Sequence, residues 1–194
     1  SLLDYTLTAI EPVSSNKILC EIFGYNQIIE ETGKVIIGNH VSIIQHPSGL
    51  PKQIAIRENQ IVDLLPDFMH YQTDTSQGSS GSPVYNDDWE LVALHHSGIP
   101  EKDKDGNILL TNGLRWQSEA DNDNIAWIAN EGVRISSIVK SLRDSINVSP
   151  SEKRQIQEML KVSGKSSGIP FMAGEMKNLP GTLIETDNRH LIIK

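Results

Sequence analysis

The stretch from Asp74 to Pro83 constrains the fold more than any other part of this 194-residue chain. It reads Asp-Thr-Ser-Gln-Gly-Ser-Ser-Gly-Ser-Pro and lies between two apolar runs. Glycine lacks a Cβ and therefore permits tight turns that other residues resist. A nucleophilic serine needs such a turn, because its hydroxyl must project and backbone N–H groups must reach a developing oxyanion. Ser80 is the candidate nucleophile, and the N–H groups of Gly78 and Ser80 are the candidate oxyanion donors.

Clusters of glycine, serine and proline are equally typical of ordinary loops, so composition alone leaves the role of this stretch open. The longer pattern is more specific. Gly78-Ser-Ser-Gly-Ser-Pro-Val84 is followed by an apolar run that ends in Leu94-His95. This pattern resembles the nucleophile region of trypsin-like serine proteases, in particular the bacterial glutamyl-endopeptidase (V8-like) branch. The resemblance is strongest over residues 35–98.

The resemblance implies a mainly β fold. We expect the second six-stranded barrel of a trypsin-like double β-barrel, preceded by the end of the first barrel and followed by C-terminal helices. Short strand-like runs separated by Gly, Asn and Pro also indicate an all-β barrel. The expected strands are 1–10, 17–23, 34–37, 41–44, 53–57, 68–73, 89–94, 108–110 and 114–116, and residues 127–129 form a final apolar segment.

Three segments are expected: 1–16 as the end of the first barrel, 17–147 as the second barrel with its helix, and 148–194 as a helical or hairpin extension or linker. From Asn130 onward, apolar residues recur every three to four positions, which predicts a helix. Ser149-Pro-Ser-Glu152 predicts a second helix that begins with a capping box. Residues 182–194 predict a β-hairpin.

Asp4 begins a strand-like run, and the resemblance implies that it is the aspartate of the catalytic triad. There it would accept the Nδ1–H of the catalytic histidine and fix its tautomer. The alternative is a plain aspartate at a strand start. In the trypsin-like order the histidine precedes the aspartate, yet all six histidines follow Asp4. We therefore expect a fragment or a processed piece, with the catalytic histidine upstream of Ser1.

The resemblance places substrate-binding residues at Asp74, Thr75, His95, Ser97 and Gly98. Asp74 would favour arginine or lysine at P1, the substrate residue before the scissile bond, by charge pairing. Thr75 and His95 instead match the pair with which glutamyl endopeptidases hold an acidic P1 side chain. The sequence leans toward the acidic P1 and leaves both preferences open. Ser97 and Gly98 would form an edge to which an extended peptide adds as a strand.

Ser79 replaces the aspartate that precedes the nucleophile in mammalian digestive proteases. In those enzymes a newly formed N-terminal ammonium pairs with that aspartate and orders the oxyanion hole. A serine carries no charge to pair, so we do not expect this route of activation.

Composition excludes several function classes. The net charge of −8 and the lack of a basic stripe argue against nucleic acid as a partner, and no apolar run is long enough to span a membrane. A single cysteine, Cys20, excludes an internal disulfide and favours a bacterial cytoplasm over secretion. His95 and His96 would point to opposite faces of a strand, so they do not predict a metal site.

The sequence thus predicts a serine endopeptidase that cleaves polypeptides by acyl transfer and uses no metal or cofactor. In the complete protein, an upstream segment would supply the catalytic histidine and a downstream effector domain would follow. The alternatives are a non-catalytic, protease-like module that binds a peptide or partner, and the protease part of a multidomain bacterial effector.

Overall fold

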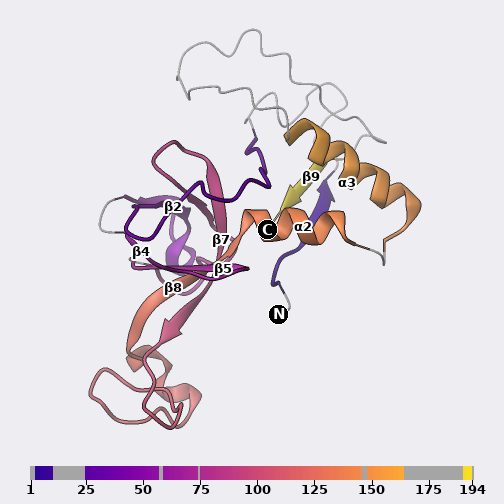
Figure 1. The fold of residues 1–194 in the computed structure, drawn as a ribbon. Helices are drawn as coiled ribbons and strands as arrows, with labels where there is room; N and C mark the ends of the chain where they lie inside the picture. Colours follow the sequence, from indigo (N-terminus) through magenta and orange to yellow (C-terminus); the bar gives the residue numbers. More distant parts are fainter. Residues whose placement is uncertain are drawn as a thin grey trace. The chain divides into compact units, whose positions relative to one another are not determined.

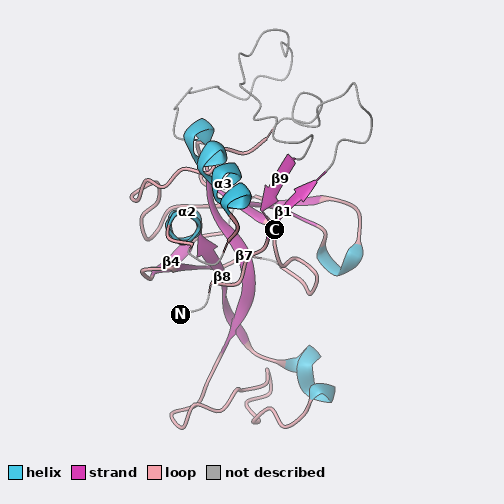
Figure 2. Ribbon diagram, turned by 90° about the vertical axis from the view of Figure 1, so that its right-hand side faces the viewer, coloured by secondary structure: helices cyan, strands magenta, loops and turns pink. Residues whose placement is uncertain are grey.

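A computed structural model describes residues 3–10, 25–56, 59–73, 75–145, 148–163 and 190–193. The chain forms two compact units, one made of Ser1–Asp4 and Thr32–Ile135, the other of Tyr5–Glu31 and Ser136–Lys194. We call the first the sheet unit and the second the helical unit. Figure 1 shows their strands and helices, with labels on both helices and on several strands, and Figure 2 shows the same elements turned by 90° about the vertical axis.

The sheet unit is built on one seven-stranded sheet in which every pair of neighbours is antiparallel. Its order is β3-β2-β6-β7-β8-β5-β4. The strands are β2 (Ser42–Gln45), β3 (Gln53–Ala55), β4 (Ile61–Leu64), β5 (Phe68–Tyr71), β6 (Pro83–Tyr85), β7 (Leu91–Pro100) and β8 (Trp127–Arg134). The predicted mainly β, trypsin-like fold is confirmed.

The sheet curls because the segments that lead into β2 and β4 are joined to each other. The Val41 N–H donates to the Asn59 carbonyl at 2.8 Å, and the Ile61 N–H donates to the Asn39 carbonyl at 2.9 Å. These bonds bring the β2 side of the sheet next to β4. Six of the strands thereby follow one another around the curl, and β3 extends from β2 as the seventh.

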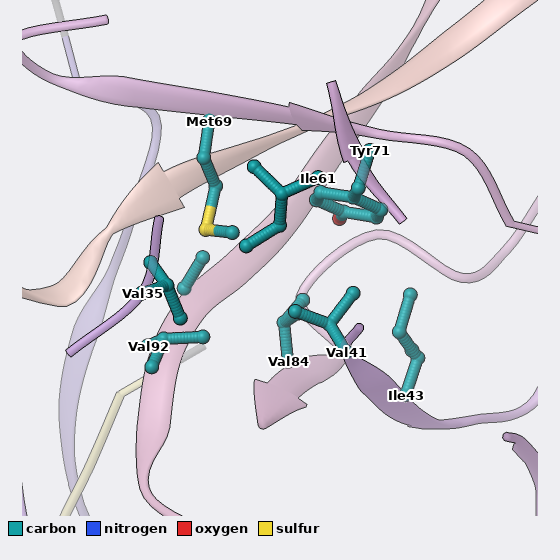
Figure 3. Close-up of a cluster of buried hydrophobic side chains, with 9 residues drawn as sticks. Val35, Val41, Ile43, Ile61, Met69, Tyr71, Val84 and Val92 are labelled. Carbon is teal, nitrogen blue, oxygen red and sulfur yellow. The ribbon is translucent and has the colours of Figure 1, made fainter. Parts of the chain in front are cut away.

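The core of the sheet unit is a cluster of buried aliphatic and aromatic side chains (Figure 3). The alternation of strands supplies them: Ile43 in β2 and Met69 and Tyr71 in β5 point inward, with partly exposed neighbours between them. The cluster consists of Val35, Val41, Ile43, Ile61, Met69, Tyr71, Val84, Val92 and Ala93.

Replacing Ile43 by alanine should lower the free energy of unfolding of the sheet unit by about 2–5 kcal/mol, because the side chain is fully buried and its loss leaves a cavity. The three tryptophans all lie in this unit, so urea unfolding followed by tryptophan fluorescence measures the effect. Ile54→Ala, on the neighbouring strand and 47% exposed, is the control and should cost well under half as much. Equal losses would contradict this assignment of the core.

Several boundaries differ from those predicted by the sequence. Residues 34–37 form no strand, although Val35 packs in the core, whereas β4 was not predicted. Residues 108–110 and 114–116 form only isolated bridges in the long connection between β7 and β8. The predicted strand 17–23 lies outside the described residues.

The predicted helix start at Asn130 is wrong, because β8 continues to Arg134 and α2 (Ile135–Arg143) begins only afterwards. The reason is tertiary. β8 pairs with β7 on one side and with β5 on the other over residues 130–133, so this segment is held by two ladders. An apolar spacing compatible with a helix cannot override that pairing.

In the helical unit, β1 (Leu7–Ile10) pairs antiparallel with β9 (His190–Ile193). The other arm of the hairpin predicted over 182–194 lies outside the described residues, and the described partner of β9 is β1, from the other end of the chain. α3 (Pro150–Ser163) begins with the predicted capping box: the Glu152 N–H donates to Ser149 Oγ at 3.3 Å, and the Ser149 N–H donates to the Glu152 carboxylate at 2.7 Å. These bonds hold the pKa of Glu152 below its usual value. Among the described helices, none has the length and apolarity to cross a membrane.

Candidate active site

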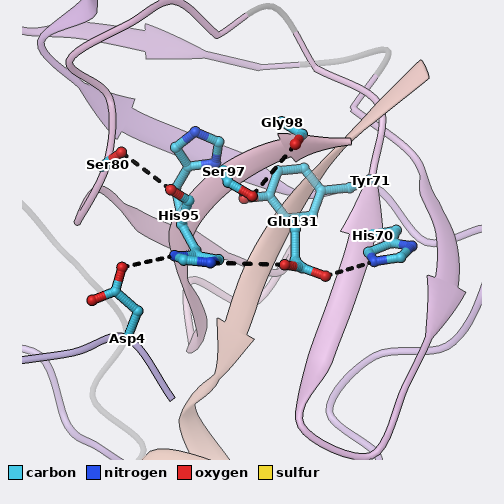
Figure 4. Close-up of polar contacts among 9 residues, drawn as sticks. Asp4, His70, Tyr71, Ser80, His95, Ser97, Gly98 and Glu131 are labelled. Carbon is cyan, nitrogen blue, oxygen red and sulfur yellow. Dashed lines mark hydrogen bonds and ion pairs between the residues drawn. The ribbon is translucent and has the colours of Figure 1, made fainter. Parts of the chain in front are cut away.

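Ser80 projects from a turn that depends on two glycines. Gly78 (φ 92°) and Gly81 (φ 80°) both have left-handed backbone conformations, which residues with a Cβ rarely adopt. Ser80 is exposed, and its Oγ donates to the His96 carbonyl at 3.1 Å (Figure 4). The turn therefore presents the hydroxyl at the surface, beside β7.

Backbone hydrogen bonds fix this turn to β7. The Gly81 N–H donates to the His95 carbonyl at 2.8 Å, and the His95 N–H donates to the Ser82 carbonyl at 2.9 Å. The Ser79 N–H is used within the loop, by the Ser76 carbonyl at 3.1 Å. The turn that carries Ser80 is thus hydrogen-bonded to β7, a strand of the sheet.

The N–H groups of the two candidate oxyanion donors differ from those of neighbouring residues in their hydrogen bonding. The N–H groups of Ser79, Gly81 and Ser82 all donate to carbonyls. Within the described residues, no hydrogen bond uses the N–H of Gly78 or of Ser80. Within that part of the chain, both backbone donors therefore remain available for an external acceptor.

Asp4 lies against His96 in a row of alternating carboxylates and imidazoles, which we call the acid–imidazole row (Figure 4). Asp4 Oδ2 is 3.1 Å from His96 Nδ1, and His96 Nε2 is 3.9 Å from Glu131 Oε1. Glu131 Oε2 is in turn 2.9 Å from His70 Nε2. His96 thus contacts Asp4 through its ring and Ser80 through its carbonyl, so the two predicted catalytic residues meet at one position of β7.

The strand register separates two faces at the site. Tyr71 and Gly98 both stand opposite Asn130, so these three residues share one face, the Tyr71 face. Glu131 stands opposite His70 and belongs to the other face. An irregularity in the β7–β8 register between His95 and Ser97 marks a local bulge, a feature that often re-aims side chains next to functional sites.

His95 and His96 consequently contact different groups. His95 is buried and its Nδ1 lies 2.9 Å from Tyr71 Oη, whereas His96 faces Asp4 and Glu131. Burial, aided by the neighbouring His96 imidazole, lowers the pKa of His95 from its ordinary value of 6.5 to about 4. Burial, together with the Glu131 carboxylate, raises the pKa of the Tyr71 phenol. At neutral pH, His95 is therefore an uncharged imidazole held by a protonated phenol.

The low pKa of His95 predicts a loss of stability in acid. Unfolded His95 binds a proton near pH 6.5, whereas the folded protein resists that proton until about pH 4. The free energy of unfolding should thus fall by about 3 kcal/mol as the pH drops through this window. Urea midpoints at pH 7 and pH 4.5 measure the loss. His95→Gln should show a smaller pH-dependent loss than the protein with His95 intact. His46→Gln, which changes an exposed loop histidine, should not differ from that protein, and equal losses in all three would contradict the assignment.

Thr75 is held by a residue that the sequence did not single out. Its Oγ1 donates to Asn130 Oδ1 at 2.5 Å, and Asn130 Nδ2 donates to the Thr73 carbonyl at 2.9 Å. Asn130 lies in β8, about 55 positions away, so no local pattern reveals the contact. Asp74, the other predicted specificity residue, lies outside the described residues.

Ser97 and Gly98 lie where β7 has one described partner strand. Beyond Leu94 the strand pairs only with β8 among the described elements, which leaves its other side available along Ser97 and Gly98. Gly98 is also tightly packed: a Cβ there would come within 2.6 Å of the Trp127 ring. Trp127 therefore covers the Tyr71 face at Gly98.

Ser79 fills a buried position beside the nucleophile. It is 1% exposed, and its hydroxyl has no hydrogen-bond partner within the described part of the chain. The site thus holds a small neutral side chain where a charged one would require a buried counter-ion.

Among the described residues, the Ser80 hydroxyl has no histidine ring as a hydrogen-bond partner. The hydroxyl bonds to the backbone of His96, and no ring nitrogen of the described histidines is hydrogen-bonded to it. His46, in the nearby loop, directs Nδ1 to the Leu50 carbonyl at 3.0 Å. The described residues also contain no group of three or more His, Cys, Asp or Glu side chains that could hold a metal ion.

Comparison with known proteins agrees with the fold. Residues 19–94 match the model of the trypsin-like peptidase domain. The chain is 36% identical over 159 residues to uncharacterized protein y4fB of Sinorhizobium fredii (strain NBRC 101917 / NGR234), an alignment that covers 74% of this chain and 24% of that protein. It is 30% identical over 125 residues to secreted RxLR effector protein 73 of Plasmopara viticola, covering 59% and 29%.

Glutamyl endopeptidase of Staphylococcus aureus (strain MW2) is 22% identical over 113 residues, covering 58% of this chain and 34% of the enzyme. The chain thus spans about a quarter to a third of the length of these relatives. The domain match includes the Ser80 turn and the first part of β7, and the curled antiparallel sheet fits it. This chain carries a trypsin-like peptidase domain, similar to part of the glutamyl endopeptidases.

Proposed function

We propose that the complete protein is a serine endopeptidase and that Ser80 is its nucleophile. The observation that carries the proposal is the Ser80 turn itself. An exposed hydroxyl lies on a turn bonded to the sheet, and no described residue accepts a hydrogen bond from the N–H groups of Gly78 and Ser80 beside it. Similarity to glutamyl endopeptidase supports the same chemistry.

In the proposed reaction, Ser80 Oγ attacks the scissile carbonyl carbon of a polypeptide and gives its proton to a histidine base. The carbonyl oxygen becomes an oxyanion, which the N–H groups of Gly78 and Ser80 stabilise. The tetrahedral intermediate collapses, the base returns the proton to the leaving amine, and water then hydrolyses the acyl-enzyme.

The base in this proposal is a histidine from an upstream segment of the complete protein. The Asp4 carboxylate would accept its Nδ1–H, and Asp4 is already close to Ser80 because both contact His96. Asp4 is 77% exposed, so its carboxylate can accept a further hydrogen bond.

Labelling of the full-length protein with a fluorophosphonate tests the proposal. This probe reacts with a serine that a base has activated, and peptide mass spectrometry locates the adduct. We expect one adduct, on Ser80. If the folded, full-length protein takes no label, the serine endopeptidase proposal fails and the non-catalytic binding module becomes the better description.

A further inference from the structure

The hydrogen bonds of Asn130 fix the direction of its carboxamide. Its Nδ2 lies 2.9 Å from the Thr73 carbonyl, which can only accept, so the amide nitrogen must be at this end. Oδ1 then faces Thr75 Oγ1 at 2.5 Å. Because Oδ1 is also only an acceptor, Thr75 must donate its one hydroxyl hydrogen to Asn130.

Thr75 therefore presents lone pairs, and no hydrogen, to any bound group. A carboxylate only accepts hydrogen bonds and gains none from Thr75 in this arrangement. A carboxamide carries an NH₂ group that can donate to Thr75 Oγ1. Thr75 matches a residue that holds an acidic P1 side chain in glutamyl endopeptidases, but its hydroxyl here can only accept a hydrogen bond from a bound group.

His95 has the opposite hydrogen-bonding role, because it offers a donor to a bound group. The Tyr71 hydroxyl is fully buried and needs an acceptor, which His95 Nδ1 provides at 2.9 Å. The neutral imidazole then carries its hydrogen on Nε2, and no hydrogen bond in the described part of the chain uses that atom. His95 can therefore donate one hydrogen bond and supplies no positive charge.

The acceptor and the donor lie on one face of the sheet. Asn130, which holds Thr75, stands opposite Tyr71, which holds His95. Gly132, two residues further along β8, stands opposite His95, and a Cβ there would come within 3.2 Å of the Tyr71 ring. Both groups also join the nucleophile turn, because Thr75 precedes it and the His95 carbonyl accepts the Gly81 N–H.

We propose that Asn130 determines specificity by holding Thr75 as an acceptor, so that the site binds a P1 glutamine in preference to the isosteric P1 glutamate. The glutamine Oε1 accepts from His95 Nε2, and its Nε2 donates to Thr75 Oγ1. A glutamate leaves Thr75 unmatched and brings a charge that neither Thr75 nor His95 compensates. The proposal rests on the proposed function in that it takes this site as the P1 site.

Binding to the full-length Ser80→Ala protein tests the inference without requiring catalysis. The probes are fluorescein-labelled peptide pools that carry Gln, Glu or Lys at one fixed position and equal mixtures elsewhere. Fluorescence anisotropy should show the Gln pool binding at least about tenfold more tightly than the Glu pool. Equal binding, tighter binding of the Glu or Lys pool, or no binding of any pool would overturn the inference.

Two substitutions at Asn130, each added to Ser80→Ala, should move the Gln-to-Glu ratio in opposite directions. Asn130→Ala frees the Thr75 hydrogen to donate to a carboxylate, so the ratio should fall toward one. Asn130→Asp keeps an acceptor for Thr75 and adds a negative charge, so the ratio should rise. Asn112→Ala, an exposed asparagine in the β7–β8 connection, is the control and should leave the ratio unchanged. A change in the same direction for both Asn130 variants would indicate only a structural role and contradict the inference.

Failure of the inference and failure of the proposed function give different results. If Ser80 takes the fluorophosphonate but the Gln pool has no advantage, the endopeptidase proposal stands and the Asn130 inference is wrong. If Ser80 takes no label but the Gln preference and its response to Asn130 persist, the inference about the binding site stands and the catalytic proposal is wrong.

Discussion

Replacing Ser80 by alanine should lower peptide hydrolysis by the full-length protein at least about 10⁴-fold. Alanine removes the atom that forms the acyl-enzyme, and the backbone N–H groups of the turn cannot replace a nucleophile. Because Ser80 is exposed and its side chain makes one hydrogen bond, the free energy of unfolding should change little. A fluorogenic peptide assay gives kcat/KM, and urea unfolding confirms the fold.

Ser76→Ala is the matched control for this experiment. Ser76 is an exposed serine in the same loop, and its carbonyl, which the substitution keeps, accepts the Ser79 N–H. The control should retain the rate within about threefold, as a surface change outside the reacting groups does. Equal rates for the Ser80 and Ser76 variants would show that hydrolysis does not depend on Ser80.

Asp4→Asn should lower kcat about 10³- to 10⁴-fold in the full-length protein. The carboxamide cannot hold the histidine base in the required tautomer, so general-base catalysis is lost while the nucleophile remains. KM should change little, because the proposed substrate contacts come from other residues. Steady-state kinetics across a range of pH separates these effects, and the pH profile of kcat should also change.

His96→Gln distinguishes a direct role of Asp4 from a structural one. In the structure Asp4 contacts His96, so Asp4 could act only by fixing that residue. His96→Gln removes the imidazole but keeps the Asp4 carboxylate, and it should cost far less than Asp4→Asn. Equal losses in the two variants would contradict a direct role of Asp4 at the base. Asp87→Asn, an exposed aspartate of the sheet unit, controls for the change in charge.

Features set by residues that are close in the sequence are predictable from local patterns, whereas features set by pairing between distant segments are not. The glycine-dependent turn around Ser80, the capping box at Ser149 and most strands of the sheet depend on nearby residues, so local patterns predict them. β8 depends on ladders with β7 and β5, and its last residues were therefore assigned to a helix. The pairing of β9 with β1 joins opposite ends of the chain, so no local pattern predicts it.

The sequence by itself indicated the type of the candidate site: a small, glycine-flanked serine with backbone N–H groups beside it. Residue identity carries that information, because only certain side chains allow the turn. The tertiary structure alone decided what surrounds the serine. It brought Asp4 to His96, Glu131 to His70, Tyr71 to His95 and Asn130 to Thr75. Each of these pairs joins residues more than twenty positions apart, so no local pattern predicts them. The strand register and the burial of these side chains set the charges and the hydrogen-bond directions at the site.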